Sequence, residues 1–211
     1  MRAEFQDREN WHKRGYMPHY ETSSRYQMIT YRLADSLPKK VVEAMLEEEI
    51  NTADKFAQSE RRQRIEYYLD RGYGSCVLKD PTVAALIIDA WEFFNTERYD
   101  LIAYVVMPTH VHLVIKMYKG HELGALVKSW KSFTTKAIHK LYDDAEFLAD
   151  WKSAFPGAFP TKIWQREYWD RFIRDERHFY KAIDYIHMNP VKAGLCREMS
   201  DWPYSSFKLL E

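Results

Sequence analysis

Two histidines separated by one valine, His110 and His112, lie in the segment HVHLVIKM. Alternating side chains over this segment predict a β-strand, in which residues two apart project from the same face of the sheet. The two imidazoles can therefore lie side by side and serve as ligands of one metal ion. The same spacing also fits two structural or solvent-facing histidines, so both alternatives stay open at this point.

A second polar pair, Tyr185 and Asn189, lies toward the end of the chain in the string DYIHMNP. The segment from Glu176 to His187 predicts a helix, and residues four apart on a helix share one face. This spacing would place a phenol next to a carboxamide. The structural alternative is a tyrosine at the edge of the core and an asparagine at the point where the helix stops before Pro190.

Basic side chains beside aromatic ones in two segments of the second half are suited to contact with nucleic acid. Lysine and arginine bind phosphates, and aromatic rings offer stacking surfaces for bases. Ordinary packing with exposed charges is the alternative for both segments. The candidate DNA-binding residues are Lys128, Lys131, Lys136, Arg166, Trp169, Arg171 and Arg174.

The strands that must position the histidines can be recognised from their apolar patterns. A short apolar run, LIAYVVM, follows Asp100 and is joined to the histidine strand through Pro108, so the two are expected to be antiparallel neighbours. The run RYQMITYRL, from Arg25 to Leu33, predicts another strand. Strands toward both ends of the chain with helices between them predict an α+β fold, in which helices pack on a central, mainly antiparallel β-sheet.

Helical periodicity and capping residues predict the remaining elements. Asp80 can cap a helix that begins at Pro81, and 39–68 fits one long helix or two shorter ones. A basic amphipathic helix is expected over 121–142, an irregular connection over 143–163, and an end of the last helix at Asn189-Pro190. We therefore expect an irregular N-terminal arm (1–24), a single domain (25–200) and a C-terminal tail (201–211).

The composition of the 211-residue chain excludes several classes of protein. With 46% hydrophobic residues it can build a core, and 31 Lys+Arg balance 31 Asp+Glu, which argues against a uniformly basic surface. The charged N-terminus predicts no secretory signal, and no apolar run is long enough to span a bilayer, so a cytoplasmic protein is expected. Cys76 and Cys196 are too far apart in sequence for a zinc knuckle and are expected to be free thiols.

Four strings occur in a recognisable order: MPTHVHLVIKM, WQREYWDRFIRD, YIHMNPVKAGL and WPYSSF. Together they resemble the REP-associated tyrosine transposases, which are relatives of the single-tyrosine insertion-sequence transposases in the HUH endonuclease superfamily. The resemblance covers about residues 25–207. It implies an HUH endonuclease-like fold with a ferredoxin/RRM-like core.

The resemblance also implies roles for individual residues. His110 and His112 match the family's metal-binding pair, Asn189 the further polar ligand, and Tyr185 the nucleophile. Tyr180 and Tyr168 are the competing candidates for the nucleophile, but neither lies in the matching YIxxNP string. The long acidic and basic segment over 39–70 departs from the family pattern and is expected to be a surface helix packed on the sheet.

The function implied by the resemblance is that of a transposase and endonuclease acting in DNA transposition and recombination. It would cleave and rejoin single-stranded or hairpin (REP-like) DNA through a covalent 5′-phosphotyrosine, assisted by Mg²⁺ or Mn²⁺, and act as a monomer or a homodimer. One alternative is a catalytically silent protein of the same fold that binds hairpin DNA. Another is a metal-dependent phosphoesterase that uses water as nucleophile, although His110, His112 and Asn189 would leave its metal without a carboxylate.

Overall fold

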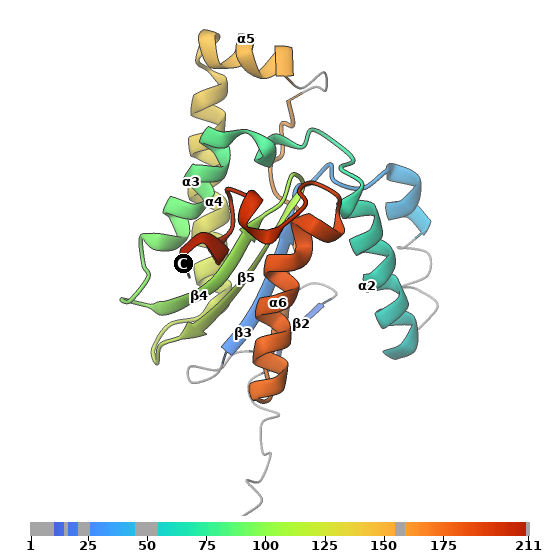
Figure 1. Cartoon of the computed structure of the whole chain (residues 1–211), viewed down its shortest axis with the longest axis vertical. Helices are drawn as coiled ribbons and strands as arrows, with labels where there is room; N and C mark the ends of the chain where they lie inside the picture. The colour runs from blue at the N-terminus through green and yellow to red at the C-terminus, as the bar shows by residue number, and fades with distance from the viewer. Residues whose placement is uncertain (1–10, 15–16, 21–25, 45–54, 155–158, 210–211) are drawn as a thin grey trace, which may run out of the picture.

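A four-stranded antiparallel sheet forms the centre of the computed structural model, which describes residues 11–14, 17–20, 26–44, 55–154 and 159–209 (Figure 1). The strand order is β4-β5-β3-β6, with β3 at Tyr26–Arg32, β4 at Tyr99–Val106, β5 at His110–Met117 and β6 at Trp169–Phe172. The α+β fold, the strand near Arg25 and the antiparallel pairing of β4 with β5 are confirmed.

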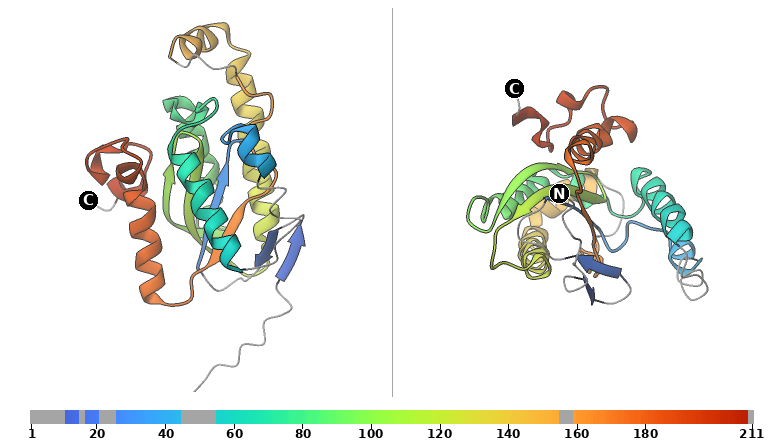
Figure 2. Two further views of the ribbon diagram at one scale, coloured as in Figure 1. Left: turned by 90° about the vertical axis from the view of Figure 1, so that its right-hand side faces the viewer. Right: turned by 90° about the horizontal axis from the view of Figure 1, so that it is seen from below.

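Helices cover both faces of this sheet. The helices α3 (Pro81–Glu92) and α4 (Leu123–Tyr142) lie on one face, and α6 (Glu176–Lys192) lies on the other. Figure 2 shows the sheet edge-on between α4 and α6. The helix α2 (Lys55–Asp70) stands beside α6, while the short helix α5 (Ala145–Ala154) projects from the far end of α4 (Figure 1).

Alternation along β5 separates the two layers of the core. Val111, Leu113 and Ile115 are fully buried in the cluster shared with α3 and α4. Val114 belongs to the smaller cluster under α6, together with Ala182 and Ile186 of that helix. His110 and His112 lie four and two residues before Val114, so their side chains project from the same face of the strand as Val114. The strand therefore directs both rings toward α6.

Two aspartates set the start of α3 and α6. The Asp80 side chain accepts hydrogen bonds from the backbone N–H groups of Thr82 and Val83, and Pro81 occupies the first helical turn, as the sequence predicts. The Asp175 side chain accepts from the backbone N–H of His178 at 2.7 Å. These caps satisfy helical donors that would otherwise lack partners.

The C-terminal segment is bound along the outer edge of β4. The Trp202 indole donates to the Val106 carbonyl at 3.0 Å, and the Val106 N–H donates to the Tyr204 carbonyl at 2.9 Å. The segment contains two 3₁₀ turns, η2 (Met199–Asp201) and η3 (Ser206–Leu209). It therefore closes the edge of the sheet opposite to β6.

The prediction of an irregular arm over residues 1–24 is wrong for its described part. Strands β1 (Trp11–Arg14) and β2 (Met17–Tyr20) pair antiparallel, and β2 lies against β6. A hairpin ladder consists of backbone hydrogen bonds, so it can form where the sequence lacks an apolar alternation. The rest of this segment lies outside the described residues.

The irregular connection expected over 143–163 contains a helix. The Asp144 side chain accepts hydrogen bonds from the backbone N–H groups of Glu146 and Phe147, both at 3.0 Å, and so caps the start of α5. Downstream Pro156 and Gly157 suggested a loop for the whole segment, but this cap starts a helix before them. Residues 155–158 lie outside the described residues.

The last helix does not end before Asn189-Pro190 as expected. It continues to Lys192 with Pro190 inside it. A proline in the last turn removes a single helical hydrogen bond, and the turn beyond it is kept by bonds from the N–H of Ala193 to the Asn189 carbonyl and from the N–H of Leu195 to the Pro190 carbonyl. As a result Asn189 stays on the helix, one turn after Tyr185.

The segment 39–68, expected as one helix or two, contains two described helical stretches, 39–44 and α2, and residues 45–54 between them lie outside the described residues. None of the described helices is long and apolar enough to cross a membrane. Cys76 and Cys196 are free thiols, as expected.

Candidate active site

The two histidines of β5 lie side by side beneath α6. His110 and His112 are each 1% exposed, and their ring centroids are 4.8 Å apart. The shared face that the His-Val-His spacing predicts is therefore the face covered by α6, and neither ring faces solvent.

Two threonines hold the histidine rings by their Nδ1 atoms. Thr30, opposite His112 in the β3–β5 ladder, lies 2.7 Å from His112 Nδ1. The Thr109 hydroxyl donates its proton to the Leu69 carbonyl at 3.0 Å and lies 3.0 Å from His110 Nδ1. A hydroxyl has one proton, so Thr109 must accept from His110 Nδ1–H. This arrangement leaves Nε2 of His110 as the atom with a free lone pair.

Burial keeps both rings neutral. Loss of solvation lowers the pKa of His112 to about 3. Burial, and then the neighbouring His112 and Arg32, hold the pKa of His110 well below its usual range. A neutral imidazole with a fixed tautomer can bind a metal ion, whereas a protonated one cannot.

The helix α6 brings Tyr185 and Asn189 to this histidine pair. The rings of Tyr185 and His112 are 5.3 Å apart between centroids and nearly perpendicular, at 78°. Asn189 is 4% exposed and lies one turn after Tyr185 on α6. Tyr185 and Asn189 therefore form one site with His110 and His112.

Two buried atoms at this site have no hydrogen-bond partner: Nε2 of His112 and Oδ1 of Asn189. Buried polar atoms are nearly always satisfied, and atoms left open in this way are typical of ligand positions. The described residues contain no group of three or more His, Cys, Asp or Glu side chains that could hold a metal. Two imidazole nitrogens and one carboxamide oxygen nevertheless fit a divalent ion that keeps open positions.

The Tyr185 hydroxyl is strongly biased toward its protonated form. Burial, then the negative charges of Glu66 and Asp70, raise the pKa of Tyr185 above its usual range, while the Asn189 side chain acts in the opposite direction. A reaction that uses this oxygen as a nucleophile therefore requires a group that takes its proton.

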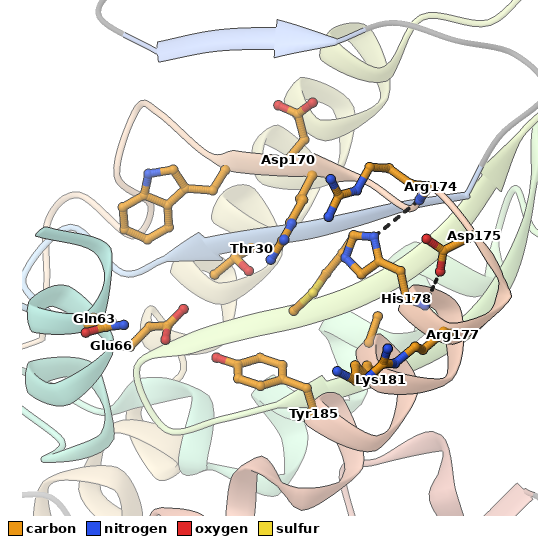
Figure 3. Close-up of a pocket in the computed structure, with 14 residues that line it drawn as sticks. Thr30, Gln63, Glu66, Asp170, Arg174, Asp175, Arg177, His178, Lys181 and Tyr185 are labelled. Carbon is orange, nitrogen blue, oxygen red and sulfur yellow. Dashed lines mark hydrogen bonds between the residues drawn. The ribbon is translucent and has the colours of Figure 1, made fainter. Parts of the chain in front are cut away.

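A groove of about 650 Å³ opens in front of Tyr185, between α2, β3, β6 and α6 (Figure 3). Four cationic side chains line it against the carboxylates of Glu66, Asp170 and Asp175. Guanidinium and ammonium groups of this kind bind phosphates. The four cations are Arg171, Arg174, Arg177 and Lys181.

Five of the seven predicted DNA-binding residues fall into two groups. Trp169, Arg171 and Arg174 line the groove beside Tyr185. Lys128 and Lys136 are exposed on α4, across the sheet from Tyr185.

The other two candidates, Lys131 and Arg166, interact with groups of the protein itself. Lys131 Nζ donates to the carbonyls of Gln165, Arg166 and Glu167 at 3.0–3.2 Å, and burial lowers its pKa to about 7. The exposed Arg166 side chain lies 3.8 Å from the Glu167 carboxylate.

The two competing tyrosines lie in other surroundings. Tyr168 is buried in the core cluster on the α3 and α4 side of the sheet. Tyr180 is 57% exposed on α6, and five residues along a helix place it on a different side from Tyr185. The structure thus brings Tyr185, and not these two, to the histidine pair.

Several residues of the site were missed in the sequence. Glu66 lines the groove from α2, with Asp70 one turn further on, and Lys192 Nζ lies 5.4 Å from the centre of the Tyr185 ring. Burial and the charge of Glu66 raise the pKa of Asp70 to about 6, while Lys192 acts in the opposite direction. No spacing marks Glu66 or Asp70 among the many acids of this segment, whereas Lys192 lies within the recognised YIHMNPVKAGL string.

Comparisons with known proteins find similar sequences and a similar structure. The family model described as "Transposase IS200 like" matches residues 77–189, which include both histidines, Tyr185 and Asn189. The REP-associated tyrosine transposase of Escherichia coli (strain K12) is 30% identical over 113 residues. A relative from Haemophilus influenzae whose name assigns it to the same kind of transposase is 30% identical over 109 residues. The matches cover 52% of this chain, and the chain spans only 54% and 59% of the two relatives' lengths.

Among solved structures, the "REP associates tyrosine transposase bound to a REP hairpin" superposes with a TM-score of 0.52. It covers 90% of this chain and 81% of its own, at 19% sequence identity. This similarity supports the fold, with its antiparallel sheet between helices.

Proposed function

Since the chain belongs to the IS200-like transposase family, we propose that it cleaves and rejoins single-stranded or hairpin DNA through a covalent bond between Tyr185 and a 5′-phosphate. The observation that carries the proposal is the position of Tyr185, whose ring contacts His112 and which lies one turn before Asn189 on α6. The two open atoms, His112 Nε2 and Asn189 Oδ1, lie in the same site.

The chemistry requires a nucleophile, a means of stabilising charge on the phosphate, and a site that holds the strand. Tyr185 supplies the nucleophilic oxygen, and α6 fixes its position against β5. A divalent ion such as Mg²⁺ or Mn²⁺, held by the Nε2 atoms of His110 and His112 and by Asn189 Oδ1, would polarise the scissile phosphate. The arginines of the groove bind the neighbouring phosphates and orient the strand.

The covalent intermediate conserves the energy of the broken phosphodiester. The 3′-end is released as a hydroxyl, and a 3′-hydroxyl can later attack the phosphotyrosine to rejoin the strand without ATP. A reversible step of this type suits a transposase, which must exchange one DNA end for another.

The substrate proposed is a REP-like hairpin with a short single-stranded foot. Support comes from the Escherichia coli relative, which is named for its association with REP elements, and from the solved structure, which contains a REP hairpin. In this chain Trp169 lines the groove beside Arg171 and Arg174, and an aromatic ring among cations suits an unpaired base next to phosphates.

The experiment that tests the proposal mixes the purified protein with single-stranded DNA from palindromes flanking its own gene, in Mn²⁺ or Mg²⁺. The expected result is a protein–DNA adduct that survives a denaturing gel and is missing with Tyr185→Phe. Tyr180→Phe, which removes an exposed hydroxyl from the same helix, is the matched control and should form the adduct normally. Tight hairpin binding without adduct in either metal would support the binding-only alternative, and an adduct with Tyr185→Phe would reject Tyr185 as nucleophile.

A further inference from the structure

We propose that Glu66, on α2, is a further catalytic residue, which accepts the proton of the Tyr185 hydroxyl during strand cleavage and returns it during rejoining. This inference rests on the proposed function and deepens it. The sequence gives no sign of this role, because the segment 39–70 was expected only as a surface helix.

The first support is the position of the Glu66 carboxylate near the reacting oxygen. Figure 3 shows this carboxylate pointing from α2 toward the Tyr185 hydroxyl across the groove, and its negative charge is, after burial, the largest cause of the raised pKa of Tyr185. Glu66 is half-buried, and both residues line the same groove. A proton acceptor can take its proton directly or through one water molecule, and the Glu66 carboxylate faces the hydroxyl from the opposite wall of the same groove.

The second support is the set of contacts that join α2 to the site. Ile65, the neighbour of Glu66, is 5% exposed and Leu69 is 1% exposed, and both pack with Leu37. The Leu69 carbonyl accepts the hydrogen bond of Thr109, whose hydroxyl holds the ring of His110. One helix therefore positions the carboxylate beside Tyr185 and also anchors the histidine pair.

The charges around the tyrosine distinguish Glu66 from its neighbours. Asp70 lies one turn further along α2 and also acts on the Tyr185 pKa through its charge, but the charge of Glu66 has the larger effect and Glu66 lines the groove together with Tyr185. Lys192, on α6, lies near the tyrosine ring. Asn189 lies one turn beyond Tyr185 on α6, and its amide N–H can donate to the tyrosine oxygen but cannot take a proton from it.

The proposed step balances as follows. In cleavage the Tyr185 proton passes to the Glu66 carboxylate, the tyrosine oxygen bonds to phosphorus, and the bond from phosphorus to the 3′-oxygen breaks. The 3′-oxygen leaves with the electron pair and takes a proton from water. In rejoining a 3′-hydroxyl loses its proton to water and attacks phosphorus, while protonated Glu66 returns its proton to the departing tyrosine oxygen.

The test compares single-turnover rates of adduct formation in saturating DNA and Mn²⁺. Glu66→Gln keeps the size and hydrogen-bonding capacity of the side chain but cannot accept the proton, and the rate is expected to fall by a factor of about 10² to 10⁴. Glu60→Gln, which removes an exposed carboxylate from the same helix, is the matched control and should react at the wild-type rate. DNA binding by Glu66→Gln should be unchanged or stronger, since the substitution removes a negative charge from the groove.

A second variant separates proton transfer from a structural role. Glu66→Ala leaves a space that opens to the groove, and added formate or acetate should restore adduct formation by about tenfold or more, because a small carboxylate can take the place of the base. The same variant should also slow rejoining of a preformed adduct to an added 3′-hydroxyl end, by a similar factor.

Three outcomes would overturn the inference. Adduct formation by Glu66→Gln at the wild-type rate would exclude the carboxylate as proton acceptor. Slow reaction of Glu66→Ala without any response to formate or acetate would assign Glu66 a structural role. Failure of the wild-type protein itself to form an adduct would reject the proposed function and this inference with it. If the wild type forms the adduct, a defect of the variants concerns Glu66 alone.

Discussion

The two faces of the central sheet differ in the kind of buried polar atom that lacks a hydrogen-bond partner. On the face covered by α3 and α4 such an atom is Nε1 of Trp130, an N–H donor that cannot bind a metal ion, whereas the face covered by α6 has atoms that can. On the face covered by α3 and α4, the Tyr31 hydroxyl accepts a hydrogen bond from the Trp91 indole at 2.8 Å, and Thr134 accepts one from Trp164 at 2.9 Å. On the face covered by α6, His112 Nε2 and Asn189 Oδ1 are buried without partners.

Tyr31 and Tyr185 illustrate the difference. Burial raises the pKa of both hydroxyls. Tyr31 is 1% exposed and is enclosed by aromatic rings, while Tyr185 faces a groove and a carboxylate. Strong burial of a tyrosine is therefore not a sign of catalysis by itself. The distinguishing features are access to a groove and neighbouring atoms that still have bonding capacity.

The largest expected effect is the loss of reaction from His112→Ala. Removing this ring takes away one of the open donor atoms beside Tyr185, so adduct formation should fall to background at every Mn²⁺ concentration, while hairpin binding persists. Gel assays with a Mn²⁺ titration, alongside filter binding, measure both. Wild-type adduct yield from His112→Ala would mean that the histidine pair is structural.

The second effect concerns the threonine that orients His110. Thr109→Val removes the hydroxyl between His110 Nδ1 and the Leu69 carbonyl, and loss of such an orienting partner typically weakens metal affinity about 10-fold to 100-fold. Adduct formation should therefore require more Mn²⁺ and recover when it is supplied.

Thr134→Val is the matched control on the other face of the sheet. It removes a buried hydroxyl that donates to the Trp130 carbonyl, and it should lower thermal stability without shifting the Mn²⁺ requirement. An equal shift in the Mn²⁺ requirement from both variants would show that the two faces are not functionally distinct.

The third effect is a loss of stability in acid that originates on the α6 face. The metal-free folded protein keeps His112 neutral down to about pH 3, whereas the unfolded chain takes up a proton below about pH 6.5. Stability is therefore lost as the pH falls below 6.5, and His112 alone should contribute a loss of about 2 kcal/mol between pH 7.5 and pH 5.

Asp70 acts in the opposite direction over the same range. Its pKa is raised to about 6, so the folded state binds this proton more readily than the unfolded chain, and its contribution to stability increases as the pH falls. Urea unfolding of the wild type, Asp70→Asn and His112→Gln in the presence of a chelator separates the two contributions. If the free energy of unfolding of His112→Gln depends on pH in the same way as that of the wild type, His112 is not the source of the loss of stability in acid.

The smallest effect compares cations on the two sides of the molecule. Arg174→Ala removes a cation from the groove, so hairpin affinity should fall modestly and the slope of log K against log salt should decrease in magnitude by about 1. Lys128→Ala, from the exposed surface of α4, should change the slope less. Equal changes would mean that bound DNA extends around the molecule to α4, where the sequence also places candidate contacts.

Local patterns in the sequence predicted much of this fold. The alternation in HVHLVIKM places both histidines on one face, and the spacing of Tyr185 and Asn189 places them one turn apart on α6. The elements predicted incorrectly depend on single local bonds, such as the Asp144 cap that starts α5 and the backbone bonds that carry α6 past Pro190.

The contribution of α2 to the site could not be predicted in the same way. Acids and bases alternate along this helix without a marked apolar stripe, so nothing in its local pattern distinguishes Glu66 from Glu60. The difference arises from tertiary packing, because Ile65 and Leu69 turn one side of the helix toward the sheet. Only the three-dimensional arrangement then identifies which carboxylate meets Tyr185.

The most direct test of the α6 face as a reaction centre is to locate the covalent bond. Tryptic digestion of the adduct should yield the peptide Ala182–Lys192, which contains Tyr185 and no other tyrosine, whereas Tyr180 and Tyr168 fall in the separate peptides 178–181 and 167–171. Mass spectrometry should find the 5′-phosphate of the DNA on Tyr185. A nucleotide attached to either of the other peptides, or no covalent species from an active preparation in Mn²⁺, would contradict this assignment.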